Sequence, residues 1–214
     1  MAAARELEIA DEPAAWSALG FAPGADGAFA LGGLRVRLAG REAGRGVVAV
    51  RVAGLAAERP DGLPVVAPDG ASAAADEPGR SRGSPARRAP ASSAPASSAH
   101  PNGALAIDHL VAFTDEVERT AGALAAAGGD VRRRGGPPEL PAPMAFVRFG
   151  ELIVEVAQAG GPVRFWGLTV TVADLDAVAG PLLGAARPAV QQCRRIATVR
   201  REAGLSVALA FMSS

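Results

Sequence analysis

The stretch that decides the fold is Ile107-Asp108-His109-Leu110-Val111-Ala112-Phe113, whose β-branched and aromatic residues predict a β-strand. Thr114-Asp115-Glu116 follows directly and offers capping side chains and acids, which suit the first turn of a helix. Apolar residues then recur at helical spacing as far as Gly128-Gly129, where the helix is expected to end. The sequence therefore predicts that this region begins with a strand followed by a helix.

Two further strands follow a proline-rich loop. They are expected at 145–149 and 152–157, joined by a tight turn at Gly150-Glu151. One more strand is expected near Val131. Together these elements give the order β-α-β-β-β.

The same order recurs at the C-terminal end of the chain. Residues 166–172 predict the opening strand, and Asp174-Leu175-Asp176 predicts the start of a helix that runs through Leu182 and stops at Gly184. Residues 196–199 and 205–211 predict a closing hairpin. An internal repeat of this kind predicts two modules that bury one helix each against a shared sheet.

A shorter copy precedes both. Leu7 and Ile9 lead into a helix start at Pro13, and strands are expected at 29–31 and 34–38. Residues 47–52 are typical of the opening strand of another copy, and 62–66 are expected to fold back onto a domain.

The chain divides at a segment that contains no Leu, Ile, Val or aromatic residue. Residues 70–99 consist almost wholly of Ala, Ser, Pro, Arg and Gly, which bury too little apolar surface to offset the entropy of ordering. We therefore predict a degenerate N-terminal module at 1–66, a disordered linker at 67–103, and a domain of two βαβββ modules, 104–160 and 161–214. The expected fold class is α+β, with a curved half-barrel mixed sheet and helices on its convex face.

Composition excludes several classes of protein. The 22 basic residues, all arginines, balance 22 acidic ones, so no net positive charge favours nucleic acid or an anionic membrane. Cys193 is the single cysteine, which fits a reducing compartment. The start of the chain lacks a signal-peptide pattern and no apolar run reaches membrane-spanning length. We expect a cytoplasmic protein.

Three segments of the sequence resemble the vicinal oxygen chelate superfamily. They are Ile107-Asp108-His109-Leu110-Val111, Gly150-Glu151-Leu152-Ile153-Val154-Glu155-Val156 and Thr171-Val172-Ala173-Asp174-Leu175-Asp176. That group includes glyoxalase I, extradiol dioxygenases and bleomycin-resistance proteins. The resemblance covers most of 106–212 and implies a bacterial protein that binds a small molecule between two modules. It also leaves a homodimer open.

In enzymes of that superfamily each module supplies metal ligands from its first and last strands. The resemblance thus implies His109 and Glu155 as metal ligands and as catalytic residues. Strand alternation independently places His109 and Glu155 on the concave face and turns Asp108 the other way, which favours a structural role for Asp108. An imidazole and a carboxylate suit a divalent ion such as zinc, iron, manganese or nickel.

The other modules depart from this pattern. By alignment Gly167 and Ala208 stand at the ligand positions of the last module, and Arg5 and Arg37 at those of the first copy. The metal site is therefore incomplete, since catalytic zinc usually has three protein ligands. Two alternatives stay open for His109: a cavity-lining histidine that hydrogen-bonds Glu155, and a metal-free proton-transfer pair with Glu155.

The function predicted first is a glyoxalase-like small-molecule-binding protein, with metal-dependent lyase, isomerase or dioxygenase activity on a small carbonyl or apolar substrate. The alternative is a non-catalytic binder like the bleomycin-resistance proteins, so whether the chain is an enzyme stays open. An assembly role for the N-terminal copy is the third hypothesis. The candidate walls of the ligand cavity are Val111, Phe113, Phe146, Ile153 and Trp166.

Three more segments contain polar residues that are considered for a role in ligand binding. Residues 191–195 are expected at the rim of the cavity or in a solvated loop, and Arg132-Arg133-Arg134 in an exposed loop, with contact to an anionic ligand as the alternative. His100 is expected in a turn with no chemistry.

Overall fold

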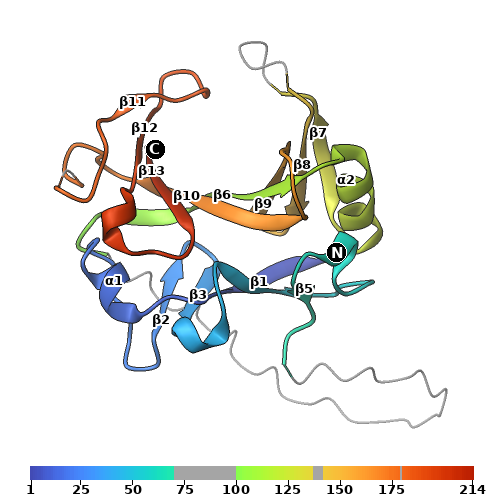
Figure 1. Ribbon diagram of the computed structural model, residues 1–214, viewed down its shortest axis with the longest axis horizontal. Helices are drawn as coiled ribbons and strands as arrows, with labels where there is room; N and C mark the ends of the chain where they lie inside the picture. The colour runs from blue at the N-terminus through green and yellow to red at the C-terminus, as the bar shows by residue number, and fades with distance from the viewer. Residues whose placement is uncertain (70–99, 137–141, 179) are drawn as a thin grey trace, which may run out of the picture.

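The computed structural model describes residues 1–69, 100–136, 142–178 and 180–214 (Figure 1). In these ranges the chain forms one five-stranded and one eight-stranded mixed sheet with few helices, which is an α+β fold. Residues 70–99, most of the expected linker, lie outside the described residues. Among the described helices none is both long and apolar enough to cross a membrane.

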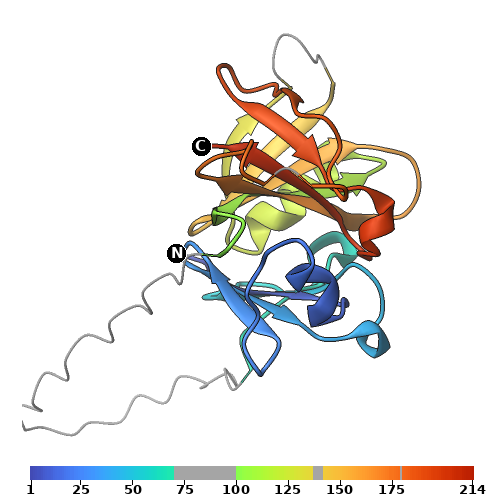
Figure 2. The ribbon, with the colours of Figure 1, turned by 90° about the vertical axis from the view of Figure 1, so that its left-hand side faces the viewer.

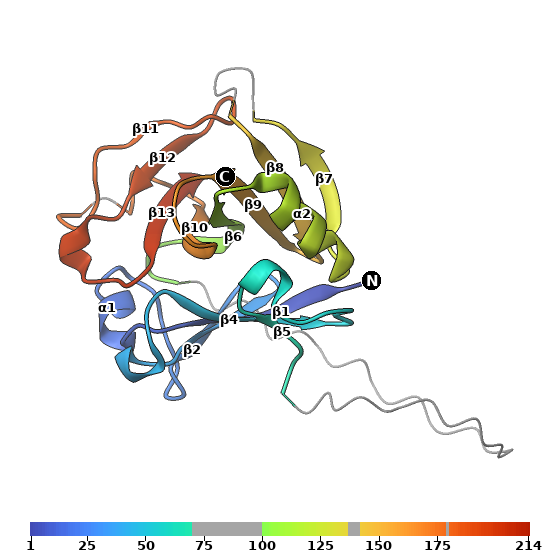
Figure 3. The same cartoon turned by 45° about the vertical axis from the view of Figure 1, so that its right-hand side comes forward.

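The larger sheet has the order β11-β12-β13-β10-β6-β9-β8-β7. It is strongly curved, so that the edges formed by β11 and β7 rise on the same side (Figures 1 and 3). Its strands are β6 (Ala104–Thr114), β7 (Asp130–Arg134), β8 (Met144–Phe149), β9 (Leu152–Gln158), β10 (Arg164–Val172), β11 (Arg187–Pro188), β12 (Arg195–Thr198) and β13 (Ala208–Ser213).

The centre of this sheet joins the two repeats. Strand β6 pairs parallel with β9 and antiparallel with β10, and β10 pairs parallel with β13. The expected hairpin between β8 and β9 is confirmed. Its turn needs Gly150, which has a φ of 64° and would bring a Cβ atom to 2.9 Å from the Cβ of Ala3.

The first predicted helix forms as α2 (Val117–Ala126) and packs on β8 and β9. Glu116 caps it, because its carboxylate accepts hydrogen bonds from the backbone N–H groups of Glu118 and Arg119 at 3.0 and 2.7 Å. Val117, Ala121 and Leu124 are buried beneath it at the expected helical spacing.

The prediction of a second helix, from Asp174 through Leu182, is wrong. Residues 175–178 form turns, and Leu183 makes an isolated bridge to Val199. Asp174 does accept hydrogen bonds from the N–H groups of Asp176 and Ala177, as a helix cap would. However, Pro181 follows within two turns, lacks an N–H group, and prevents the helix from continuing.

The smaller sheet, with the order β2-β3-β1-β4-β5, is built from the N-terminal residues. As expected, 62–66 fold back, and β5 pairs parallel with β4. This sheet lies against the convex side of the larger one (Figure 2). Its elements are β1 (Ala3–Ile9), α1 (Pro13–Ser17), β2 (Ala28–Leu31), β3 (Leu34–Leu38), the 3-10 turn η1 (Arg41–Ala43), β4 (Val47–Ala53), η2 (Pro60–Gly62) and β5 (Val65–Val66), and a third 3-10 turn, η3 (Arg201–Ala203), precedes β13.

One continuous apolar core joins the two sheets. Phe21 stacks on Phe211 of β13, with ring centroids 5.7 Å apart, and both rings are buried. The buried carboxylate of Asp11 accepts hydrogen bonds from the Trp16 indole at 3.2 Å and from the Ser206 N–H at 2.7 Å. The N-terminal sheet thus covers convex surface that the missing second helix leaves open.

His100 has a structural role that the sequence did not reveal. Its ring is buried and packs edge-on against Phe21 and Phe29, and Nδ1 accepts a hydrogen bond from the Ala22 N–H at 3.2 Å. With Nδ1 accepting, Nε2 carries the proton and donates to the Ala30 carbonyl at 2.8 Å. The residue therefore fastens the start of the second half of the chain to the N-terminal sheet.

Candidate functional site

The concave face of the larger sheet carries the candidate site. Side chains alternate across each strand, so the face opposite the core of β6 presents His109, Val111 and Phe113. Glu155 of β9 and Thr169 of β10 face the same side, because they pair with Val111 and His109 respectively. Parallel pairing of β6 with β9 is what brings the two predicted residues together from distant parts of the chain.

His109 and Glu155 lie close enough to interact. The distance from His109 Nε2 to Glu155 Oε2 is 3.8 Å, and both side chains are mostly buried. Thr169 Oγ1 lies 3.1 Å from the same nitrogen. No hydrogen bond from another described residue reaches the Glu155 carboxylate. His109 Nε2 is therefore placed between a hydroxyl group and a carboxylate.

Asp108 takes part in the site, and the expectation that it points away from His109 is wrong. The pairing of β6 with β10 steps from His109 opposite Thr169 to Ile107 opposite Val170, which leaves Asp108 as the extra residue of a β-bulge. The bulge turns the Asp108 carboxylate toward the imidazole, where Oδ2 lies 2.8 Å from His109 Nδ1. Strand alternation contains no signal for such a bulge.

The contacts of Asp108 fix the orientation of the imidazole. An ionised carboxylate can only accept, so Nδ1 donates to Asp108, and in the neutral ring Nε2 accepts the hydrogen bond of Thr169. Arg194 donates to the other oxygen of Asp108 at 2.8 Å and to the Ser213 carbonyl at 2.7 Å. The side chain of Arg194 therefore fixes the position of Asp108 on the side away from His109. Residues 191–195 were expected only at the rim of the cavity or in a solvated loop.

The two carboxylates have pKa values shifted in opposite directions. Burial by itself would raise the pKa of Asp108, but hydrogen bonds from His109 and Arg194 outweigh it and lower that pKa. Burial raises the pKa of Glu155, and the opposing charges of His109 and Arg133 do not cancel this effect. Asp108 is thus the stable anion of the site, and Glu155 is the carboxyl group that more readily holds a proton.

The donor set does not fit the divalent metal that the resemblance implied. Within the described residues no three His, Cys, Asp or Glu side chains gather in a way that could hold a metal ion. Aligned with His109, Gly167 has no side chain, and its pairing with Ala208 is so close that a Cβ atom would lie 2.8 Å from the Cβ of Ala208. His109 and Glu155 alone are fewer ligands than a catalytic zinc site uses.

The match to Glu155 in the last module also needs correction. Glu155 pairs with Val111, and Thr169, the residue that corresponds to Val111, pairs with Ala210. Strand pairing therefore aligns Ala210, rather than Ala208, with Glu155. Both are alanines on the concave face, so the last module supplies no carboxylate in either register.

The concave surface contains two adjoining cavities, which we call the polar lobe and the apolar lobe. Their volumes are about 410 and 350 Å³. Both are lined by His109, Met144, Glu155 and Ile196, so these residues form the common floor. The polar lobe adds Arg133, Phe146, Arg187, Pro188, Ala189, Val190 and Gln191, and the apolar lobe adds Val111, Phe113, Ala157, Trp166, Leu168, Thr169, Thr198, Ala208, Leu209 and Ala210.

The predicted wall residues divide between the lobes. Phe113 and Trp166 stack in the apolar lobe with ring centroids 4.9 Å apart, and Trp166 remains 46% exposed. Phe146 lies in the polar lobe under the Arg133 guanidinium, which is 4.4 Å from its ring centroid. Val111 lines the apolar lobe, whereas Ile153 lines neither. Arg133, for which contact with an anionic ligand was the alternative expectation, lines the polar lobe from β7 rather than from a loop, and Arg187 was not among the expected ligand-binding residues.

Comparison with known proteins gives only structural likenesses. No protein-family model matches the sequence, and no curated protein matches it. Similar solved structures include methylmalonyl-CoA epimerase from Mycobacterium tuberculosis, with 12% identity, a TM-score of 0.42, and coverage of 50% of this chain and 86% of that one.

Two further structures are similar to the same extent. A hypothetical protein from Bacillus halodurans C-125 has 12% identity and a TM-score of 0.42, over 50% of this chain and 93% of that one. A Streptomyces coelicolor methylmalonyl-CoA epimerase variant in complex with 2-nitronate-propionyl-CoA has 15% identity and a TM-score of 0.42, over 50% of this chain and 96% of that one. Each of these likenesses is one of fold and covers half of this chain.

Proposed function

We propose that this protein binds a small organic molecule in the two joined lobes of the concave surface. The observation that carries the proposal is that His109 and Glu155 line both lobes, so one ligand can touch them while filling either side. Each cavity has the size of an ordinary ligand pocket, roughly 300–1,000 Å³. A mainly apolar wall with a few convergent polar groups is typical of such pockets.

The residues of the site divide the work of binding. Phe113 and Trp166 offer flat apolar surface to a ring or chain, and stacking there is favourable. His109, held by Asp108, presents Nε2 to the ligand, where in the neutral ring it can accept a hydrogen bond from the ligand in place of the one from Thr169. Glu155 in its protonated form can donate one to a carbonyl oxygen.

The first test is a thermal-shift screen with a panel of neutral and charged molecules of about 10–20 heavy atoms, because a ligand of the folded state raises Tm by mass action. Compounds that raise Tm are then titrated by calorimetry against wild type, Trp166→Ala and, as a control on the outer side of β7, Arg132→Gln. We expect Trp166→Ala to weaken binding about tenfold or more, the usual range for losing a stacked aromatic anchor. Unchanged affinity in Trp166→Ala and in His109→Ala would rule the site out.

Treatment with a chelator tests the metal-dependent alternative. Since the donor set does not fit a divalent ion, we expect chelator-treated protein to keep its ligand affinity and its Tm. Loss of either, restored by zinc, manganese, iron or nickel, would contradict this expectation.

A second candidate function is metal-free proton transfer, favoured by the 2.8 Å contact between Asp108 and His109 Nδ1. A carboxylate in that place fixes the tautomer and stabilises the imidazolium that forms when Nε2 takes a proton from a ligand carbon. Glu155, 3.8 Å from Nε2, can return a proton on the same side.

Solvent exchange tests this candidate. A ligand from the screen that carries an acidic C–H bond is incubated with the protein in deuterium oxide, and its deuterium content is followed by NMR. We expect wild type to speed the exchange and Asp108→Asn to slow it about 100-fold or more while affinity is kept, because general-base catalysis contributes typically 10²–10⁴-fold. Exchange at the same rate in both proteins would leave binding as the only function.

A further inference from the structure

The polar lobe has arginines on opposite sides. Arg133 lies on β7 and Arg187 on β11, and these two strands are the edges of the curved sheet (Figure 3). Both side chains line the polar lobe. Both are exposed to solvent, so neither is needed by the core. Gln191 adds an amide group to the same lobe.

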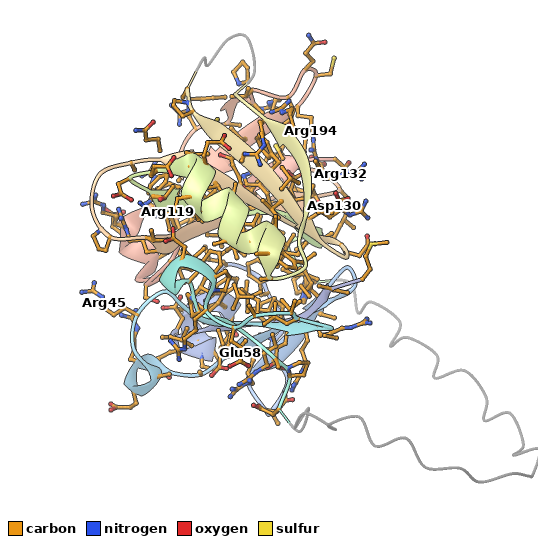
Figure 4. The ribbon with its side chains drawn as sticks, turned by 90° about the vertical axis from the view of Figure 1, so that its right-hand side faces the viewer. Arg45, Glu58, Arg119, Asp130, Arg132 and Arg194 are labelled. Carbon is orange, nitrogen blue, oxygen red and sulfur yellow. The ribbon has the colours of Figure 1, made fainter. Side chains whose placement is uncertain are left out.

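The arginines of β7 differ in what they contact. Arg132 pairs with Asp130 at 2.9 Å on the outside of the sheet (Figure 4), and Arg134 pairs with Glu118 of α2. Arg133, between them, points to the concave side and lies over the Phe146 ring. Within the described residues Arg133 and Arg187 make no ion pair, whereas Arg132 and Arg134 do. The guanidinium groups of Arg133 and Arg187 are therefore available to a ligand in the polar lobe.

The charges of the polar lobe favour an occupant with one negative charge. Arg133 and Arg187 contribute two positive charges, and Glu155, when ionised, contributes one negative charge. Guanidinium groups recognise carboxylates through paired hydrogen bonds. Among the described residues that line the apolar lobe, the one acidic or arginine side chain is Glu155, which both lobes share, and the lobe ends in the stacked Phe113 and Trp166 rings.

We propose that the ligand is an amphipathic monocarboxylic acid, with its carboxylate between Arg133 and Arg187 and its aryl or alkyl body on Phe113 and Trp166. This inference rests on the proposed function, because it names the class of molecule that the two lobes bind. The chain of the ligand crosses the common floor, so the carbon atoms next to its carboxylate lie beside His109 and Glu155.

The experiment uses a matched series of probes on the full-length chain: phenylpropionate, phenylbutyrate and phenylhexanoate, each beside its neutral amide. Affinities are measured by calorimetry at low salt for wild type, Arg133→Gln, Arg187→Gln, Trp166→Ala and Arg132→Gln. The substituted side chains are exposed, and circular dichroism checks that each variant is folded.

We expect at least one acid of the series to bind about tenfold or more tightly than its amide, an energy difference of about 1.4 kcal/mol or more. Arg133→Gln and Arg187→Gln should each remove most of this preference, and Arg132→Gln should keep it. Trp166→Ala should weaken the acid and the amide alike. Higher salt should reduce the affinity of the acid only.

Three outcomes overturn the inference, and they separate it from the proposed function. Equal affinity for acid and amide, or a preference that survives both Arg133→Gln and Arg187→Gln, rejects the carboxylate assignment, although binding that depends on Trp166 still supports a ligand site. Binding of none of the six probes, together with binding of neutral panel compounds that depends on His109, also rejects the acid class alone. Binding of nothing at all rejects both proposals.

Discussion

The N-terminal sheet and the centre of the larger sheet have the same strand order and pairing, but the side chains on the faces that point away from the shared core differ. The order β2-β3-β1-β4-β5 matches β8-β9-β6-β10-β13, and the four pairings are antiparallel, parallel, antiparallel and parallel in both. The elements also follow each other in the same order along the chain. We propose that residues 1–66 are a reduced copy of the paired unit at 104–214.

The buried faces of the two sheets explain why the architecture is shared. In the N-terminal sheet a cross-strand row joins Val36, Leu7 and Val50, and in the larger sheet the corresponding row joins Val154, Leu110 and Leu168. Each of these six side chains is at most 2% exposed. Branched aliphatic residues on one face stabilise the strand order in both sheets, whatever the other face carries.

The opposite faces show how the two sheets diverged. With these rows aligned, Glu6, Arg37 and Arg51 occupy the places of His109, Glu155 and Thr169, so His109 corresponds to Glu6 rather than to Arg5. The N-terminal face is an ion-pair network, in which Arg37 and Arg51 lie 2.7 and 3.0 Å from the Glu8 carboxylate. In the part of the chain that the structure describes, the N-terminal sheet has no counterparts of β7, β11 and β12, the strands that form the walls of the lobes.

The largest expected effect comes from the core that joins the two sheets. Phe211→Ala should lower the free energy of unfolding by about 3–5 kcal/mol, because it removes a buried ring and its stacking on Phe21. Urea unfolding is followed by circular dichroism and by Trp16 fluorescence in a Trp166→Phe background. We expect one transition seen by both probes. Separate transitions would show that the two sheets are independent units.

The two histidines should differ in what they contribute. His100→Ala leaves the Ala22 N–H and the Ala30 carbonyl without partners, which should cost about 1–3 kcal/mol for each group that stays buried. His109→Ala should cost less than His100→Ala, because Asp108 keeps its hydrogen bond from Arg194 when the imidazole is removed. Chemical denaturation of both variants measures the difference. A larger loss in His109→Ala would mean that the site is part of the folding core.

The smallest effects on the free energy of unfolding should come from replacing Glu155 on the ligand face and Glu8 on the N-terminal face, and their signs should be opposite. Burial raises the pKa of Glu155, so the folded state holds this proton more tightly than the unfolded chain. The resulting stabilisation is fully present below the unfolded pKa and is lost as pH rises through the folded pKa. Glu155→Gln avoids that loss, so it should be more stable than wild type at pH 7, with the gain disappearing below about pH 4.

Glu8→Gln is the matched control on the N-terminal face. It removes the carboxylate between Arg37 and Arg51, so at pH 7 it should lower the free energy of unfolding by about 1–3 kcal/mol. Thermal unfolding of both variants across pH 4–8 makes the comparison. The same sign in both would contradict the view that one face is built for stability and the other for a ligand.

The sequence by itself determined the elements that depend on neighbours along the chain. Alternation identified β6, β9 and β10, spacing and capping residues identified α2, and Gly150 identified the turn between β8 and β9. Alternation also placed His109 and Glu155 on the same face, since side-chain direction in a strand is a local property. These features needed no knowledge of distant contacts.

Tertiary structure alone decided the rest, because it depends on segments that are far apart in sequence. The bulge at Asp108 exists only in the pairing of β6 with β10, and it gives His109 its carboxylate partner. Arg133 and Arg187 face one lobe only because the sheet curves and brings its edges to the same side. The helix predicted at 174–182 has good local signals, yet Pro181 ends it and the N-terminal sheet covers the convex side instead. Local patterns fix which way a side chain points, and only packing over long distances fixes what it meets.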